Sequence, residues 1–218
     1  MSTSPSSRRQ FLRQSAQLAG AGAFGVPLLG ANAVVDDGVR ELTSEELIDA
    51  RTQGAIDKGL RFLASRQIGR GVDRGAFGAS SYNGSVGICG IAGLAFMCEG
   101  STPGIGRYGK QVEACTQFLI RNTSATGYIA RAGGRGTGNM YGHGFAMLCM
   151  TQAYGMTRQK ELGQKLRTAV KLTLSAQNDE GGWRYQPSPT DADLSVTVCQ
   201  IMALRAARDA GITVPDPS

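Results

Sequence analysis

The chain has 218 residues, 41% of them hydrophobic, and this size and composition favour one ordinary domain with a sizeable core. Its formal net charge is +6, but Arg8, Arg9 and Arg13 lie in an N-terminal stretch without acidic residues. The remainder carries 20 of the 23 basic side chains against all 17 acidic ones. Because this balance leaves no basic stripe, and no nucleic-acid module is recognisable, we expect no nucleic-acid partner.

The first 33 residues have the pattern of an export signal. Residues 7–13 read Ser-Arg-Arg-Gln-Phe-Leu-Arg and resemble the bacterial twin-arginine signal; a Gly/Ala-rich apolar region and the small-residue pattern Ala31-Asn32-Ala33 follow. The resemblance implies a signal peptide over residues 1–33, a linker over 34–43, and a periplasmic or cell-envelope location. The alternative is a short N-terminal anchor helix that stays uncut. Because no later apolar run reaches roughly 18 to 20 residues, we expect no transmembrane helix in the mature chain.

The first predicted hairpin pairs an amphipathic helix with an apolar one. Thr43 and Glu46 have the spacing of a capping box at a helix start. Further on, Ile56, Leu60 and Leu63 recur at helical spacing. After a Gly-rich loop, residues 86–98 are apolar or small throughout, and a helix that is hydrophobic on all sides is buried on all sides.

The same pair of helices recurs twice. Its parts are an amphipathic helix around 112–119, a Gly-rich loop over 127–144, an apolar helix over 145–153, a third amphipathic helix over 162–176 and an apolar helix over 194–207. Phe62 and Phe118 are 56 positions apart, and Phe118 and Leu172 are 54 apart. A fixed period of helical hairpins indicates a repeat architecture.

The alternation of the two helix types predicts the kind of repeat. In an open solenoid both helices of a hairpin keep a solvent-facing side, whereas here one helix of each pair is apolar all round. This pattern fits amphipathic helices outside and apolar helices inside. We therefore predict an all-α fold, an α/α toroid present as a half-ring arc of three antiparallel hairpins. The repeat domain is expected to span residues 44–218 and to be incomplete.

Two half-motifs carry a family resemblance. Residues 58–67 read Lys-Gly-Leu-Arg-Phe-Leu-Ala-Ser-Arg-Gln, and residues 177–183 read Gln-Asn-Asp-Glu-Gly-Gly-Trp. Together they resemble the repeat of squalene and hopene cyclases, within the terpenoid cyclase and protein prenyltransferase superfamily. The resemblance implies an α/α toroid over roughly residues 55–211. The first repeat lacks the Trp, and the second has Thr123 in place of the Gln and Gly127-Tyr128 in place of Gly and Trp.

The Gln and Trp of this motif have two interpretations. As structural residues, Gln67 and Gln177 would hydrogen-bond free backbone groups at a helix end, and the Trp183 indole would pack between helices and donate from its nitrogen. The alternative gives Trp183 a substrate-stacking or cation-stabilising role.

The candidate site residues lie near the predicted starts of the apolar helices. If the repeats superpose, Tyr82, Tyr141 with His143, and Asp191 with Asp193 occupy equivalent places on one rim, where helix N-termini favour an anionic ligand. The adjoining loops supply Arg184 and Tyr185 as further substrate contacts. Arg131, Arg135 and Arg184 are the candidate partners of a diphosphate.

The segment Asp191-Ala192-Asp193-Leu194 is similar to the Asp-x-Asp-Asp motif of class II terpene cyclases, in which the middle Asp protonates the substrate. The resemblance implies that Asp193 is the catalytic acid and Asp191 its neighbour, although Leu194 replaces the last Asp. Such an acid must be held neutral. The alternative is that Asp191 or Asp193 is the N-cap of the helix that begins at Leu194.

The sequence predicts no metal and no cofactor. His143 is the single histidine, and no Asp is followed two residues later by Cys, as in the zinc site of the protein prenyltransferases. His143 is either a general acid, base or anion contact, or a helix-start residue with its hydrogen bonds satisfied. The five cysteines fall in apolar helix patterns, so buried free thiols are expected.

Two classes of function follow from these patterns. One is an exported enzyme or lipid-handling protein that binds or cyclises an isoprenoid lipid in a central cavity. The other is a non-catalytic α/α repeat module that binds a peptide, glycan or protein partner in the cell envelope. In either class the open end of the arc exposes apolar surface. Two alternatives follow: the chain is a truncated product, or two arcs meet in a homodimer through this end.

Overall fold

The computed structural model describes residues 48–78, 80–131 and 139–215, which belong to the unit formed by residues 45–218. Within these ranges the fold is all-α, without a strand, as predicted. The elements are α3 (Ala50–Arg66), the 3-10 turn η1 (Ser80–Tyr82), α4 (Val86–Cys98), α5 (Gly109–Arg121), α6 (Met140–Thr157), α7 (Lys160–Ser175) and α8 (Leu194–Asp209). Among these helices none has the length and hydropathy needed to cross a bilayer. The predicted signal peptide, the linker and the Thr43–Glu46 capping box lie outside the described residues.

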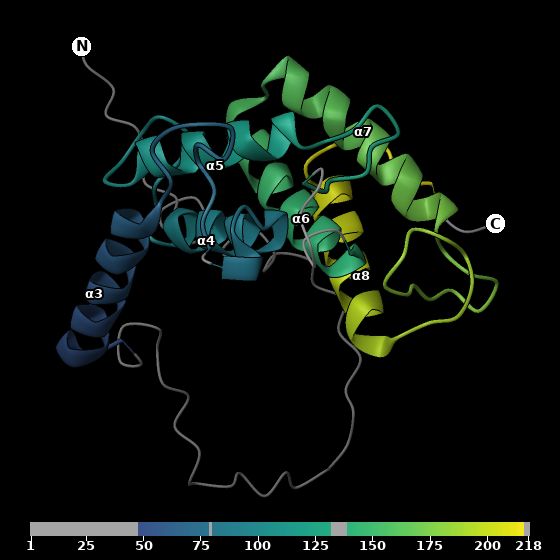
Figure 1. The fold of residues 1–218 in the computed structure, drawn as a ribbon, viewed down its shortest axis with the longest axis horizontal. Coiled ribbons are helices and arrows are strands. Elements are labelled where there is room, and N and C mark those ends of the chain that lie inside the picture. Colours follow the sequence, from purple (N-terminus) through teal and green to yellow (C-terminus); the bar gives the residue numbers. More distant parts are fainter. Residues whose placement is uncertain (1–47, 79, 132–138, 216–218) are drawn as a thin grey trace, which may run out of the picture. The chain divides into compact units, whose positions relative to one another are not determined.

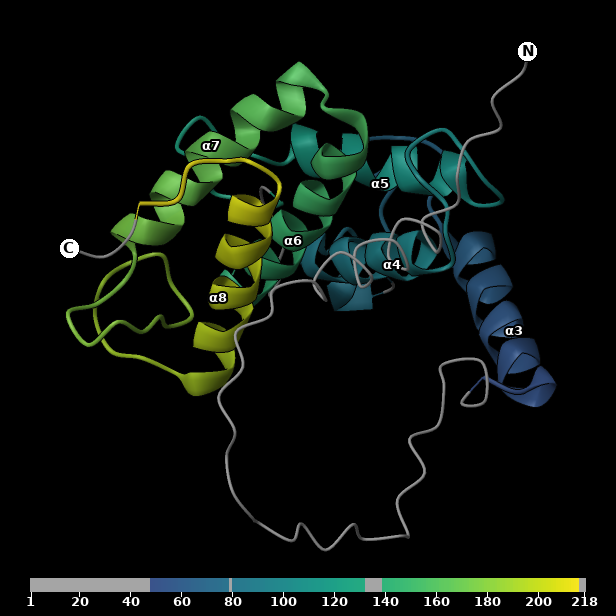
Figure 2. The same ribbon diagram turned by 180° about the vertical axis from the view of Figure 1, so that it is seen from behind.

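The apolar helices pack on one another and the amphipathic helices lie along them. Helix α6 packs between α4 and α8; α5 contacts both α4 and α6, and α7 contacts both α6 and α8. Figures 1 and 2 show α4, α6 and α8 side by side from opposite directions, with α5 and α7 along one side of them. Helix α3 packs against α4. The hairpins read from the sequence therefore pack in chain order.

Three N-cap residues fix the register of the repeat. Ser85, Asn139 and Asp193 each precede an apolar helix, and each side chain accepts a hydrogen bond from a backbone N–H in the first turn. They are spaced 54 positions apart. Such caps satisfy N–H groups that have no partner inside the helix. Residues at the same distance from these caps are thus equivalent in α4, α6 and α8.

Glycines allow the apolar helices to approach closely. A Cβ atom at Gly90 of α4 would lie 2.6 Å from the carbonyl oxygen of Phe145 in α6. At the equivalent position of α6, a Cβ at Gly144 would lie 2.9 Å from Nε2 of Gln200 in α8. Both distances are shorter than ordinary van der Waals contact. The close spacing of these helices therefore requires glycine, which has no side chain, at both positions.

Two helix starts differ from the prediction. Helix α3 begins at Ala50, where the Asp49 side chain accepts from Thr52 N at 2.6 Å. Helix α6 begins at Met140, five residues before the predicted start, and Asn139 is its N-cap. The glycines of its first turn had favoured a loop in the sequence. Tyr141 and His143 therefore lie inside α6, and their predicted equivalence with Asp193 is wrong: the equivalent of Asp193 is Asn139.

Candidate functional site

The loop between α7 and α8 folds back on itself and buries Trp183. The backbone and side chain of Asn178 both bond to Gly182, and Gln177 Nε2 donates to the Gly181 carbonyl at 2.9 Å. Any Cβ at Gly182 would overlap Ala192, so this position requires glycine. The tight turn directs the next residue, Trp183, into the core.

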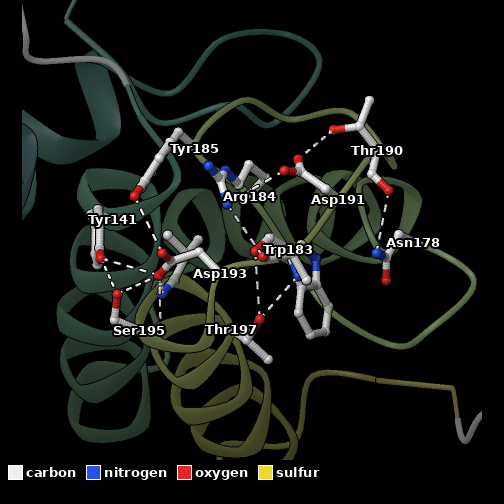
Figure 3. A network of polar contacts seen from close by, with 12 residues as sticks. Tyr141, Asn178, Trp183, Arg184, Tyr185, Thr190, Asp191, Asp193, Ser195 and Thr197 are labelled. Carbon is white, nitrogen blue, oxygen red and sulfur yellow. Dashed lines mark hydrogen bonds and ion pairs between the residues drawn. The ribbon is translucent and has the colours of Figure 1, made fainter.

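Trp183 is a structural joint between α7 and α8. Its side chain is 2% exposed, and Nε1 donates to the Thr173 carbonyl of α7 at 2.7 Å. Its backbone N donates to Thr197 Oγ1 of α8 at 3.1 Å, and its carbonyl accepts from Asp193 N at 2.8 Å (Figure 3). A ligand has no access to the indole, so the structural interpretation from sequence holds and the stacking one is disfavoured.

Gln67 has the corresponding role at the end of α3. Its Nε2 donates to the Gly75 carbonyl at 3.0 Å and to the Gln111 carbonyl of α5 at 3.0 Å. The Gln therefore ties a helix end both to its own loop and to the next amphipathic helix, as expected from the motif.

His143 is buried and neutral. Its ring lies at 0% exposure; Nδ1 accepts from Ile129 N at 3.2 Å, and Nε2 lies 2.9 Å from Thr173 Oγ1. Because Nδ1 accepts, the proton sits on Nε2, which donates to Thr173. Burial lowers the pKa of His143 to about 4. The residue has its hydrogen bonds satisfied by Ile129 and Thr173, and its ring is closed to solvent.

Asp193 is the N-cap of α8, the alternative that the sequence left open. Oδ1 accepts from the backbone N–H groups of Ser195 at 3.0 Å and Val196 at 3.1 Å, and also from the Ser195 hydroxyl. The Ser195 hydroxyl and then the Val196 N–H lower the pKa of Asp193 to about 2. At neutral pH this carboxyl is ionised, which is the opposite of what a protonating acid needs.

Two tyrosines stand beside this carboxylate (Figure 3). The Tyr185 hydroxyl donates to Asp193 Oδ2 at 3.2 Å, and the Tyr141 hydroxyl lies 3.5 Å from Oδ1 and hydrogen-bonds Ser195. Their ring centroids are 6.0 Å apart. The negative charge of Asp193 is the main cause that raises the pKa of Tyr185. Sequence reasoning named both tyrosines but missed Ser195, although its place in the first turn after a capping Asp was a usable signal.

The two described arginines among the predicted diphosphate partners already form ion pairs. Arg131 pairs with Asp73 through two contacts, Nε to Oδ1 at 2.7 Å and a second guanidinium nitrogen to Oδ2 at 3.0 Å. Arg184 lies 3.4 Å from Asp191 Oδ2, and its guanidinium stacks over the Tyr185 ring at 4.7 Å. Arg135 lies outside the described residues. Both described arginines of this set are thus paired with a carboxylate.

The remaining predicted residues lie apart from this network. Tyr82 is 61% exposed on η1 and is not among the residues gathered around Asp193. Over the described ranges, no three His, Cys, Asp or Glu side chains are grouped so as to hold a metal ion. The cysteines are unpaired, but Cys98 is exposed at the last residue of α4, where the prediction had it buried.

An apolar stripe on α4, α6 and α8 was also missed. Counted from the caps, the sixth residues are Ile91, Phe145 and Cys199, and the ninth are Leu94, Leu148 and Met202. All six are exposed or half-buried, although α4 and α6 are otherwise mostly buried, and Ile91 and Met202 are each 49% exposed. Ser195 and Tyr141 are the second residues after their caps, so the stripe leads along the helices toward the polar network.

Comparison of the chain with models of protein families, with curated proteins and with solved structures finds no match.

Proposed function

We propose that the chain is an arc of an α/α toroid, of the kind found in terpenoid cyclases and prenyltransferases, that binds an isoprenoid-like lipid without transforming it. The observation that carries the proposal is the apolar stripe. Six side chains at matched positions on three neighbouring helices stay accessible, and five of them are large and apolar. Apolar side chains left accessible at matched positions of packed helices are a candidate interaction surface.

The polar end of the stripe selects the head group. The Asp193 carboxylate is ionised and lies beside Tyr141, Ser195 and Tyr185. A negative charge at this end repels a diphosphate and favours a neutral hydroxyl or a cation. Arg131 and Arg184 are each paired with an aspartate, which leaves less positive charge for a diphosphate. The preferred ligand is therefore an apolar chain with an uncharged or cationic end.

A photo-crosslinkable geranylgeraniol tests the proposal on the full-length protein. We expect labelling of peptides from α4, α6 and α8, competition by unlabelled geranylgeraniol, and at least tenfold weaker competition by geranylgeranyl diphosphate. Ile91→Asp is expected to weaken labelling about tenfold, because it places a charge in the stripe. Ile105→Asp is the matched control, since Ile105 is 72% exposed outside the stripe.

Three results would overturn this proposal. They are an absence of specific labelling, equal effects of the two Asp variants, and a preference for the diphosphate. Enzymatic turnover is tested separately by chromatography of the recovered lipid, whose retention should not change. A new product that Asp193→Asn abolishes would favour the cyclase prediction instead.

A further inference from the structure

The contact between successive hairpins depends on one glycine in each loop. Gly75 has φ +96°, and a Cβ there would lie 2.6 Å from the carbonyl carbon of Ala114 in α5. Gly127 has φ +94°, and a Cβ there would lie 2.7 Å from the backbone nitrogen of Ala169 in α7. Each glycine thus lets a loop rest directly on the backbone of the next amphipathic helix.

The third loop has the same glycine without the helix. Gly181 follows Gly127 by 54 positions and has φ +85°. Within the described residues, a Cβ at Gly181 would meet only Nε2 of Gln177, at 3.7 Å. Gln177 likewise bonds its own loop, whereas Gln67 also reaches the Gln111 carbonyl of the next helix. The third loop is therefore shaped to receive an amphipathic helix.

Helix α8 is open on the side that the next hairpin covers in α4 and α6. The first residues after the caps are Val86 and Met140, both at 0% exposure, and Leu194, at 82%. The eighth residues after the caps show the same difference: Gly93 and Met147 are buried, whereas Ile201 is 52% exposed. A concavity of about 490 Å³ lies on this side, lined by Asp193, Leu194, Ser195 and Val198.

Helix α3 is open on the complementary side. Ile56 is 40% exposed, whereas its equivalents in the other amphipathic helices, Val112 and Leu166, are at 0%. Phe62 is 58% exposed, and its equivalent Phe118 is at 0%. A Cβ at Gly59 has nothing within 4 Å, yet the equivalent positions hold Cys115 and Ala169, both at 0%. Helix α3 thus has the face that α5 and α7 bury, but leaves it exposed.

We propose that a second copy of the chain docks head to tail, with its α3 against α8 and the Gly181 loop of the first copy. Among the described residues, no amphipathic helix covers the open side of α8, whereas α3 presents the matching face, in the register of the same repeat. The spacing of 56 positions between Phe62 and Phe118 assigns the contacts. Gly181 lies against the backbone of Lys58 of the second copy, and Gln177 Nε2 donates to the carbonyl of its Ala55.

This interface differs in kind from a two-fold dimer contact. Each copy presents two different surfaces, so the association is heterologous and its two ends can be blocked separately. The concavity shares Asp193 and Ser195 with the polar end of the apolar stripe. The test of docking needs no lipid, because neither Ile56 nor Val198 belongs to the stripe.

A mixing experiment tests the head-to-tail contact. Full-length Ile56→Asp blocks the α3 end, and Val198→Asp blocks the α8 end. In sedimentation equilibrium each variant alone should be monomeric, with an apparent Kd at least tenfold above wild type. An equimolar mixture should form a complex of two copies, because one α8 end and one α3 end remain intact. Ile105→Asp is the control and should associate as wild type does.

Specific results overturn the inference. The inference is wrong if the wild-type chain stays monomeric up to about 100 µM. It is also wrong if the mixture stays monomeric, or if either variant associates by itself. Gly181→Ala gives a second measurement that adds no charge, and it should also weaken association at least tenfold. Its control is Gly100→Ala, since Gly100 has φ +111° and nothing within 4 Å of a Cβ.

Discussion

The loop glycines that contact the next amphipathic helix, Gly75 and Gly127, allow a direct test of the repeat packing. The substitution is Gly127→Ala. An alanine at φ +94° is strained, at a cost of about 1 to 3 kcal/mol. Its Cβ would also overlap the Thr168 carbonyl of α7, which forces the loop and the helix apart by about 1 Å and costs about 1 to 3 kcal/mol more. Together these effects lower the free energy of unfolding by about 4 kcal/mol.

Gly181→Ala is the matched control for this prediction. Its φ of +85° gives a similar strain, but the nearest atom to its Cβ lies at 3.7 Å, so the overlap is absent. Urea unfolding at low protein concentration, followed by circular dichroism and by Trp183 fluorescence, should give a midpoint about 1 M lower for Gly127→Ala than for Gly181→Ala. Equal midpoints for the two variants would refute the packing role of the glycine.

Three further predictions concern the buried residues His143 and Trp183 and the surface carboxylate Asp193. Burial lowers the pKa of His143 to about 4, so below about pH 6.5 the unfolded chain binds a proton that the folded chain does not. The free energy of unfolding should therefore fall by about 2 kcal/mol between pH 7.5 and pH 5. His143→Gln should remove this pH dependence in urea unfolding, and a slope that persists in the variant would contradict the assignment. Asp193→Asn should shift the pKa of Tyr185 down, as seen in an absorbance titration at about 295 nm, because the carboxylate is the main cause that raises it. Trp183→Phe should cost about 1 to 3 kcal/mol in thermal unfolding, since the Thr173 carbonyl loses its buried indole partner; an unchanged midpoint would show that this bond is not needed.

Hydrophobic pattern predicted the helices well where turn residues marked their ends. The predicted bounds of residues 86–98 match α4, and Leu194 begins α8 as expected. The start of α6 was missed because Gly142 and Gly144 are typical of loops, whereas here Gly144 serves close helix packing. Their role depends on a neighbouring helix, which local sequence does not specify.

The chemistry of the site was harder to predict than its place. The sequence put Asp193 at a helix start, but its ionised state depends on the Ser195 hydroxyl and the Val196 N–H, which are fixed only by the folded geometry. His143 was a candidate because it lies near the predicted start of an apolar helix and an imidazole can act as an acid, a base or an anion contact. Its burial against Ile129 and Thr173 follows from the packing of three elements and has no local signature.

Thr173 joins these elements at one buried point. Its hydroxyl meets the His143 ring of α6, and its carbonyl accepts from the indole that precedes α8. Helices α6, α7 and α8 should therefore open together in hydrogen exchange. Helix α3 should exchange first, because the face that carries Ile56 and Phe62 is exposed. If a second copy covers α3, the protection of the α3 amides against exchange will rise with protein concentration. Exchange of α3 would then report assembly.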